Sequence, residues 1–263
     1  YIDEDFLNWI NDNYQLESLI TIKDKLNVSS YQLQSWHDVT GKSLQVLYDS
    51  YQNNYENKDN VKVITDNKEV STINFVGDIS LADNFDIMPY YDSRQEGVYG
   101  ILSEDVVDIM QKADLMVANN EFSFSDRGVP LPNKYYTFRG SPSRVSIYHE
   151  MGVDLVSLAN NHVYDYGEDA FLDTITTLDN ADIAHVGAGK NKEEAQEPYY
   201  YIIGGYKVAF ISATRAEKFI LTPEATETQS GVFRCYDPEE LLSLIETTKQ
   251  ESDYVIVLLH WGK

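Results

Sequence analysis

The spacing of apolar residues along the chain changes near residue 70. Before this point apolar side chains recur every three or four residues, a period that predicts amphipathic helices. The positions are Phe6, Leu7, Ile10 and Tyr14, then Leu19, Ile22 and Leu26, and then Leu44, Leu47 and Tyr51. The polar residues between them show no spacing typical of a metal or catalytic site. Residues 1–70 are therefore predicted to form a small helical module, a separable unit that packs or binds a partner without chemistry of its own.

After residue 70, short apolar runs alternate with longer amphipathic stretches. This alternation predicts strands connected by helices and hence a largely parallel sheet. Strands are predicted at residues 72–76, 115–118, 155–158, 183–186, 208–211 and 254–259, and helices at 103–112, 142–151, 169–180 and 238–251. Residues 71–263 are therefore predicted to form one α/β domain.

Four of the predicted strands end on a side chain that can bind a metal. INFVGD ends at Asp78, LMVANNE at Glu121, LVSLANNH at Asn161 and His162, and the run VIVLLH at His260. In open α/β sheets ligands bind outside the carboxyl ends of the strands, so these side chains should share one rim. One such residue is usually a turn former or a helix cap. Four endings of ligand type favour a divalent-metal site for Mn, Fe, Zn or Mg.

Two other polar residues have both a functional and a structural interpretation. Asp165 follows His162 by three residues, so it either orients that imidazole or caps a helix, with Asn160 in an Asx turn. Arg139, in YYTFRGSP, is either a fork for a carboxylate or phosphate group or a solvated loop charge. Because few basic residues occur near the predicted rim, the substrate-binding interpretation of Arg139 is favoured.

The charge of the chain restricts its partners. It has 20 Lys and Arg residues against 43 Asp and Glu residues, a formal net charge of -23. This charge repels nucleic acid and anionic lipid at long range, so a nucleic-acid partner is excluded. The charge of an anionic substrate must therefore be met locally, by a metal or by a few placed cations. The single cysteine, Cys235, rules out an intramolecular disulfide.

Six motifs, in this order, carry a resemblance to a known family. GDISL, ANNEF, YYTFRGSP, GVDLVSLANNHVYDYG, VGAGKNKEEAQEP and LLHWGK resemble the CapA (PgsA) family of poly-γ-glutamate capsule biosynthesis proteins, from about residue 72 to the end. That family resembles a branch of the calcineurin-like metallophosphoesterases. The resemblance implies a metallophosphatase-like fold, a four-layer sandwich of sheets flanked by helices, with a dimetal site on the sheets.

The resemblance also implies roles for individual residues. It implies metal ligands at Asp78, Glu121, Asn161 and His260. His162 would then act as an acid toward the leaving group rather than as a firm ligand. The sequence departs from the phosphoesterase pattern at Ser80, which stands where that pattern has a histidine. The family also continues beyond HWG into a further His-containing segment, so the ligand set in residues 71–263 is expected to be incomplete.

These observations leave two function classes open. The first is an enzyme, in which a metal activates water for hydrolysis of a phosphoester or of an amide in a polyglutamate chain. The second is a non-catalytic subunit of a capsule synthesis or export machine, which binds polyglutamate carboxylates through a metal or Arg139. A purely structural domain would leave the four strand endings unexplained. Either role predicts an extracytoplasmic location, contact with membrane capsule-synthesis subunits, and an anchor or lipoprotein signal upstream of Tyr1.

Overall fold

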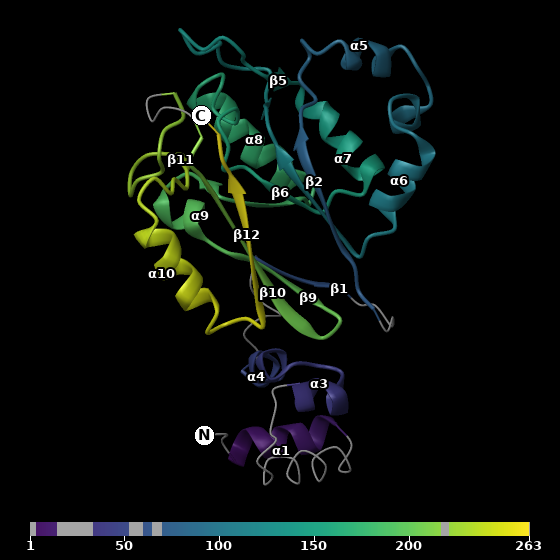
Figure 1. Ribbon diagram of the computed structural model, residues 1–263, viewed down its shortest axis with the longest axis vertical. Helices are drawn as coiled ribbons and strands as arrows, with labels where there is room; N and C mark the ends of the chain where they lie inside the picture. Colours follow the sequence, from purple (N-terminus) through teal and green to yellow (C-terminus); the bar gives the residue numbers. More distant parts are fainter. Residues whose placement is uncertain (1–3, 15–33, 53–59, 65–69, 217–220, 263) are drawn as a thin grey trace. The chain divides into compact units, whose positions relative to one another are not determined.

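The computed structural model describes residues 4–14, 34–52, 60–64, 70–216 and 221–262 (Figure 1). These residues belong to two compact units. The first unit comprises Tyr1–Ser71, Tyr200–Ala209 and Glu246–Ile256, and the second comprises Thr72–Tyr199, Phe210–Ile245 and Val257–Lys263. In the described part of the chain, no helix is both long and apolar enough to cross a membrane.

The first unit contains the helices α1 (Glu4–Asn13), α3 (Gln34–Thr40) and α4 (Leu44–Tyr51). Their apolar faces meet in a small core, because the helical spacing places one buried side chain per turn toward the centre. The buried members are Phe6, Ile10, Trp36 and Leu47. Ser43 caps α4 by accepting a hydrogen bond from the Val46 amide. The predicted helical positions Leu19, Ile22 and Leu26 lie outside the described residues.

The first unit also contains a strand that the apolar spacing did not predict. β1 (Val61–Ile64) pairs in parallel with β9 (Tyr199–Ile203), so the range 1–70 is not helical throughout. The four-stranded sheet has the order β1-β9-β10-β12. Its other strands, β10 (Tyr206–Thr214) and β12 (Tyr254–His260), begin in the first unit and end in the second. The separable module at residues 1–70 stays a prediction.

The second unit is built around a parallel sheet in the order β2-β3-β6-β7. Its strands are β2 (Ile73–Ile79), β3 (Leu115–Asn120), β6 (Leu155–Ser157) and β7 (Ala184–Val186). Parallel neighbours need crossover connections, which here contain α6 (Glu104–Gln111), α7 (Ser146–Met151) and α8 (Glu168–Asn180). All four carboxyl ends therefore lie along one edge of this sheet.

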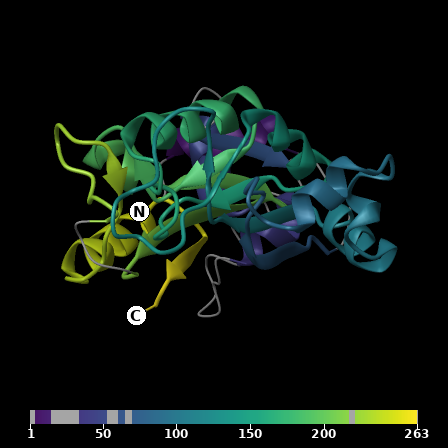
Figure 2. The same ribbon diagram turned by 90° about the horizontal axis from the view of Figure 1, so that it is seen from above.

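Shorter elements complete the second unit. The helical ones are α5 (Ile87–Asp92), η1 (Gly97–Gly100), η2 (Pro142–Val145) and α9 (Lys192–Gln196), while α10 (Glu239–Thr248) begins in this unit and ends in the first. The strand pairs are β4 (Ser123–Phe124) with β5 (Arg139–Gly140), and β8 (Ala188–Gly189) with β11 (Gly231–Val232). Figure 2 shows α5 and α6 at one edge of this unit and the yellow-green segment from β11 to α10 at the opposite edge.

The end of β10 faces the parallel sheet of the second unit. The hydroxyl oxygens of Ser157 on β6 and Ser212 on β10 lie 2.7 Å apart, and both side chains are buried. Gly187 makes this close approach possible, because a Cβ there would lie 2.6 Å from the Ala159 Cβ and 2.8 Å from Ser212. The predicted fold class is confirmed: the chain is an α/β protein, and the end of β10 packs against the parallel sheet as expected for the predicted sandwich of sheets flanked by helices.

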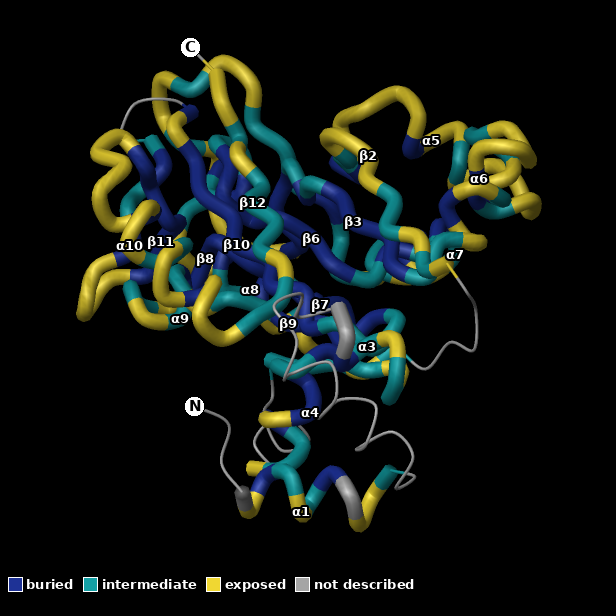
Figure 3. The backbone as a smooth tube through the Cα atoms, turned by 60° about the horizontal axis from the view of Figure 1, so that its bottom comes forward, coloured by how far each residue is buried: buried dark blue, intermediate teal, exposed yellow. Residues whose placement is uncertain are grey.

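Exposure differs between the inner and the edge strands of the sandwich (Figure 3). β3 and β6 are almost entirely buried, whereas β2 and β12 are half-buried or exposed along most of their length. Because β2 and β12 each lie at the edge of a sheet, side chains at their carboxyl ends have access to solvent. The residues that end these two strands are Asp78 with its neighbour Ile79, and His260.

Candidate metal centre

The position of Asp78 depends on an irregularity in β2. Phe75 lies opposite Val117 and Asp78 opposite Asn119, so three steps along β2 match only two along β3. One extra residue of this kind is a β-bulge, which redirects the side chains that follow it. Without it, Gly77 would lie opposite Asn119. The bulge therefore brings the Asp78 carboxylate to Asn119, whose amide nitrogen donates to Asp78 Oδ1 over 2.8 Å.

Alternation at the end of β3 separates a structural residue from two residues of the site. Because successive side chains of a strand point to opposite faces, Asn119 and Glu121 belong to one face and Asn120 to the other. Asn120 is fully buried and accepts a hydrogen bond from the Tyr148 hydroxyl at 2.7 Å. The Glu121 amide donates to the Ile79 carbonyl at 2.9 Å, which fixes the glutamate beside the end of β2.

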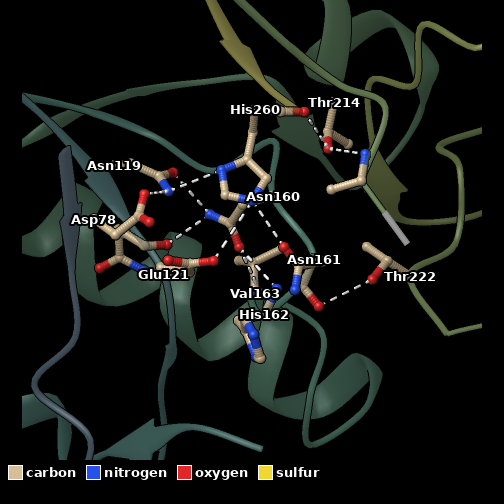
Figure 4. A network of polar contacts seen from close by, with 12 residues as sticks. Asp78, Asn119, Glu121, Asn160, Asn161, His162, Val163, Thr214, Thr222 and His260 are labelled. Atoms are coloured by element: carbon tan, nitrogen blue, oxygen red, sulfur yellow. Dashed lines mark hydrogen bonds and ion pairs between the residues drawn. The ribbon is translucent and has the colours of Figure 1, made fainter. Parts of the chain in front are cut away.

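His260 ends β12 and joins the polar network from the other sheet (Figure 4). Its Nε2 lies 2.7 Å from Asn161 Oδ1 and 3.5 Å from Glu121 Oε1, and its Nδ1 lies 3.3 Å from the Asn119 amide nitrogen. One ligand atom each from Asp78, Glu121 and His260 lies within 4.8 Å of the others. We call these three residues the rim cluster.

The two carboxyl groups of the rim cluster have shifted pKa values. Burial raises the pKa of Glu121 to about 8, and the hydrogen bond and negative charge of Asp78 act in the same direction. Burial also raises the pKa of Asp78, but hydrogen bonds with Asn119 and Glu121 and the charge of His260 outweigh it, so the net shift is downward. The carboxyl pair therefore tends to hold one proton, carried by Glu121. Burial lowers the pKa of His260, which favours the neutral imidazole.

This donor set fits a divalent cation. Two carboxyls that keep a proton because one of them is buried beside the charge of the other form a site that lacks positive charge, which a cation supplies. Carboxylate oxygens and a neutral imidazole nitrogen are ligands of Mn, Fe and Zn. The Asn161 carboxamide oxygen, 2.7 Å from His260 Nε2, adds a further oxygen donor at the same place. The structure thus brings together all four residues predicted as metal ligands.

His162 lies beside the rim cluster but is not part of it. Its Nδ1 is 2.7 Å from Asp165 Oδ2, and its ring packs on Phe138 with centroids 4.4 Å apart. Asp165 is fully buried and also forms an ion pair with Lys134, whose Nζ is 2.7 Å from Oδ1. The Lys134 ammonium group also donates to the Asn161 carbonyl. Asp165 therefore orients His162, the first of the two interpretations of the sequence.

A shallow cleft of about 230 Å³ opens next to His162. Its lining residues are Lys134, Tyr135, Tyr136, Asn161, His162, Ala216 and Gly262. Tyr135 and Tyr136 are 90% and 62% exposed, so their rings and hydroxyls are available to a ligand. Since Asn161 and His162 line this cleft, which we call the His162 cleft, a substrate bound in it would lie beside the rim cluster.

Arg139 is not brought to the rim cluster. Its guanidinium group donates to the carbonyls of Arg127 and Gly128 at 2.8 and 3.1 Å and stacks over the Tyr166 ring at 4.3 Å. These contacts explain its place in the fold without a ligand. A substrate-binding role for Arg139 stays a prediction from the sequence.

Sequence reasoning missed two residues of the network, and the structure assigns a structural role to a third. Asn119 orients Asp78, and the sequence signal for it was its spacing of two residues from Glu121, which places both on one face of the strand. Lys134 gave no signal, because its partners lie 27 and 31 residues further along the chain. Asn160 forms the predicted Asx turn, since its side-chain oxygen accepts from the His162 amide at 2.9 Å, and its amide nitrogen donates to Asn119 Oδ1 at 3.0 Å.

Comparison with known proteins agrees with this arrangement of motifs. The family described as "Bacterial capsule synthesis protein PGA_cap" matches residues 72–263, which is more than half of the chain. The capsule biosynthesis protein CapA of Bacillus anthracis is 29% identical over 204 residues, 74% of this chain and 47% of that protein. The PGA biosynthesis protein CapA of Bacillus subtilis (strain 168) is 26% identical over 204 residues, 77% of this chain and 52% of that protein.

A mycobacterial protein matches a shorter stretch. A probable polyglutamine synthesis accessory protein of Mycobacterium tuberculosis is 27% identical over 158 residues, which are 57% of this chain and 41% of that protein. The chain thus spans about half the length of the curated relatives it matches. Because the family match covers the whole second unit, including every residue of the rim cluster, the chain belongs to the PGA_cap family of bacterial capsule synthesis proteins.

Proposed function

We propose that the second unit is a metal-dependent hydrolase domain that acts on an anionic capsule polymer or on a phosphoester precursor of it. The observation that carries this proposal is the rim cluster of Asp78, Glu121 and His260 beside the His162 cleft. With Asn161, these residues would hold Mn, Fe, Zn or Mg. A bound divalent ion would supply Lewis acidity and a water molecule that loses its proton near neutral pH.

The chain's own residues would position the ligands, transfer the proton and bind the substrate. Asn119 holds the Asp78 carboxylate in place, and Glu121 lies 3.5 Å from His260 on the other sheet. His162 would give a proton to the leaving group, because Asp165 holds its Nδ1 and so leaves Nε2 for the substrate. Tyr135 and Tyr136 would bind the substrate through their exposed rings and hydroxyls.

The names of the relatives support the choice of polymer. Two of them are named for capsule or PGA biosynthesis and a third for polyglutamine synthesis. We infer that this chain handles poly-γ-glutamate or a related anionic polymer together with membrane-bound synthesis subunits. A capsule lies outside the cell, so we infer an extracytoplasmic location. Protease treatment of intact cells should degrade the protein, and full protection would contradict this location.

The test of the proposed function combines metal binding with turnover. Calorimetric titration with Mn²⁺, Zn²⁺ and Mg²⁺ should show binding to the wild-type protein, and the loaded protein should hydrolyse either γ-linked glutamate oligomers or a phosphoester. The variant His162→Ala should keep the metal and lose turnover by roughly 100-fold to 10,000-fold, the range for a general acid.

His185→Ala is the matched control, since His185 Nε2 also contacts a carboxylate, that of Asp179 at 3.0 Å, outside the site. Metal binding without turnover of either substrate would instead indicate a polyglutamate-binding subunit.

A further inference from the structure

An acidic protein that handles a polyanion needs local positive charge, and several described cations near the site already have partners within the chain. Lys134 is paired with Asp165, and Arg139 with main-chain carbonyls. Arg127 is paired with Asp173. Arg215 differs: it is exposed, and within the part of the chain that the structure describes its guanidinium group contacts aromatic rings and has neither a carboxylate nor a carbonyl partner.

Aromatic rings hold the Arg215 guanidinium group in place. Its central carbon lies 4.8 Å from the centre of the Trp261 ring and 5.6 Å from that of Tyr236. Both rings are partly open to solvent, with 64% and 51% of their residue surface exposed. Contact of the guanidinium plane with ring faces leaves its N–H edge free, and that edge can donate two parallel hydrogen bonds to one carboxylate or phosphate group.

Arg215 lies next to the His162 cleft but outside the rim cluster. Its amide donates to the His260 carbonyl at 3.0 Å, which places it beside the end of β12. Ala216 and Gly262, which line the cleft, are the chain neighbours of Arg215 and Trp261. Arg215 is exposed, while Thr214 and Ala216 on either side of it are buried, so its guanidinium group lies at the surface near the cleft.

We propose that Arg215, flanked by Trp261 and Tyr236, is an oxyanion subsite that binds a carboxylate of an anionic polymer whose neighbouring unit occupies the His162 cleft. The proposal rests on the proposed function, because it names the substrate class of the same site. A ligand with repeated carboxylates reaches both places, whereas a small phosphoester fills only the cleft. The two rings would also cover the aliphatic part of the polymer and so favour a chain with methylene groups.

The experiment compares Arg215→Gln with Arg94→Gln in the whole chain. Arg94, which follows α5, is the matched control, because it is also exposed. Its guanidinium carbon lies 3.8 Å from the ring of Tyr90 on α5. The probes are a γ-linked glutamate oligomer of defined length and inorganic phosphate, titrated by calorimetry at two salt concentrations. Arg215→Gln should weaken oligomer binding about tenfold or more, the effect of losing a charge-assisted hydrogen-bonded pair, and should reduce its salt dependence.

Arg215→Gln should leave phosphate affinity and Mn²⁺ affinity as in the wild type. The control Arg94→Gln should leave all three affinities unchanged. Oligomer affinity that is unchanged in Arg215→Gln, or lowered equally in Arg94→Gln, overturns the subsite. A loss confined to phosphate also overturns it. If the wild-type protein binds the oligomer through Arg215 but binds no metal, the proposed hydrolase function fails while the subsite stands. If the wild-type protein binds metal but Arg215→Gln does not change oligomer affinity, the subsite fails while the proposed hydrolase function stands.

Discussion

Lys134, Asp165 and His162 form a chain of buried contacts that connects a loop to the candidate centre. The side chain of Lys134 is 3% exposed and that of Asp165 is fully buried, and the two form an ion pair. Such a pair contributes little net stability, but removal of one partner leaves a buried charge without compensation. Because this pair holds both the Asn161 carbonyl and the His162 ring, its main effect should be on the geometry of the site.

We expect Lys134→Met to lower the free energy of unfolding by about 3–5 kcal/mol and to change the hydrogen bonding of the His162 ring. Lys207→Met should lower the stability similarly, because Lys207 is 5% exposed and its Nζ lies 2.5 Å from Asp49. Only Lys134→Met should shift the imidazole nitrogen signals of His162 in NMR spectra. Equal His162 signals in both variants, each confirmed as folded, would contradict the role assigned to Lys134.

A second prediction concerns the pH dependence of the metal-free protein. The pKa of Glu121 rises from 4.5 to about 8 on folding, so the folded state binds this proton more tightly than the unfolded state. The resulting stability is complete below pH 4.5 and is lost as the pH rises through about 8. Because Glu121 is partly solvated, we expect a loss on the order of 2 kcal/mol.

Thermal melting in a chelator at pH 5 to 8 checks this prediction. The variant Glu121→Gln carries no titrating group at this position, so its melting temperature should fall less than that of the wild type over the same interval. A parallel decline in the two proteins would show that Glu121 does not titrate there.

At the scale of elements, the site depends on the close approach of two sheets. His260 comes from the sheet of β10 and β12, while Asp78 and Glu121 come from the sheet of β2 and β3. Gly187, after β7, lies close to both Ala159 and Ser212: its φ is +87°, and a Cβ would lie 2.6 Å from the Ala159 Cβ and 2.8 Å from the Ser212 Cβ. Any side chain at this position should push β10 away from β6 and so disturb the distance between the ligands.

We expect Gly187→Ala to destabilise the protein by about 2–5 kcal/mol, from backbone strain together with overpacking, and to weaken Mn²⁺ binding. The control Gly167→Ala also places a side chain at a positive φ, +84° with ψ at -175°, but a Cβ there meets nothing within 4 Å. It should cost about 1–3 kcal/mol and leave Mn²⁺ affinity unchanged. Urea unfolding and calorimetry measure both quantities. Equal losses in the two variants would rule out sheet separation as the cause.

The sequence pattern predicted the long elements and missed features that depend on contacts. The strand at 155–158 and the helix at 169–180 were found within one residue of their observed ends, because their apolar spacing is regular. β1 was missed, since four residues carry too little pattern to reveal a strand that exists through pairing with β9. The bulge before Asp78 was also missed, because only the register against β3 defines it. The sequence therefore identified the residues at the strand ends, whereas the distances between them depend on contacts that the sequence pattern does not reveal.

For the whole molecule, the excess of acidic residues sets the condition that any anionic ligand must meet. With a formal net charge of -23, unscreened approach of a polyanion is unfavourable, so binding should depend on bound metal and on few cations. The helical region before residue 60 supplies no described residue to the rim cluster. Its α4 covers part of the first unit's sheet, where Val46 packs with Ile202.

We predict that deletion of residues 1–59, which keeps β1, leaves Mn²⁺ affinity unchanged and lowers the melting temperature. The affinity should hold because all proposed ligands belong to the second unit, and the stability should fall because Ile202 loses its cover. Calorimetric titration and thermal melting of the shortened protein test this. Loss of metal binding in a folded deletion variant would contradict the separation of the two roles.

The central claim is that Asp78, Glu121 and His260 bind a divalent metal, and calorimetric Mn²⁺ titration of Asp78→Asn tests it most directly. This substitution keeps the shape of the side chain and removes a charged ligand, so the affinity should fall by at least the roughly 10-fold to 100-fold found when a hydrogen-bond partner of a metal ligand is changed. Above about pH 8, where both carboxyls are charged, the metal-free variant should melt at the same or a higher temperature than the wild type, because repulsion between carboxylates is relieved. Unchanged Mn²⁺ affinity in Asp78→Asn, Glu121→Gln and His260→Ala alike would contradict the claim, and the rim cluster would then be turn and strand-end chemistry alone.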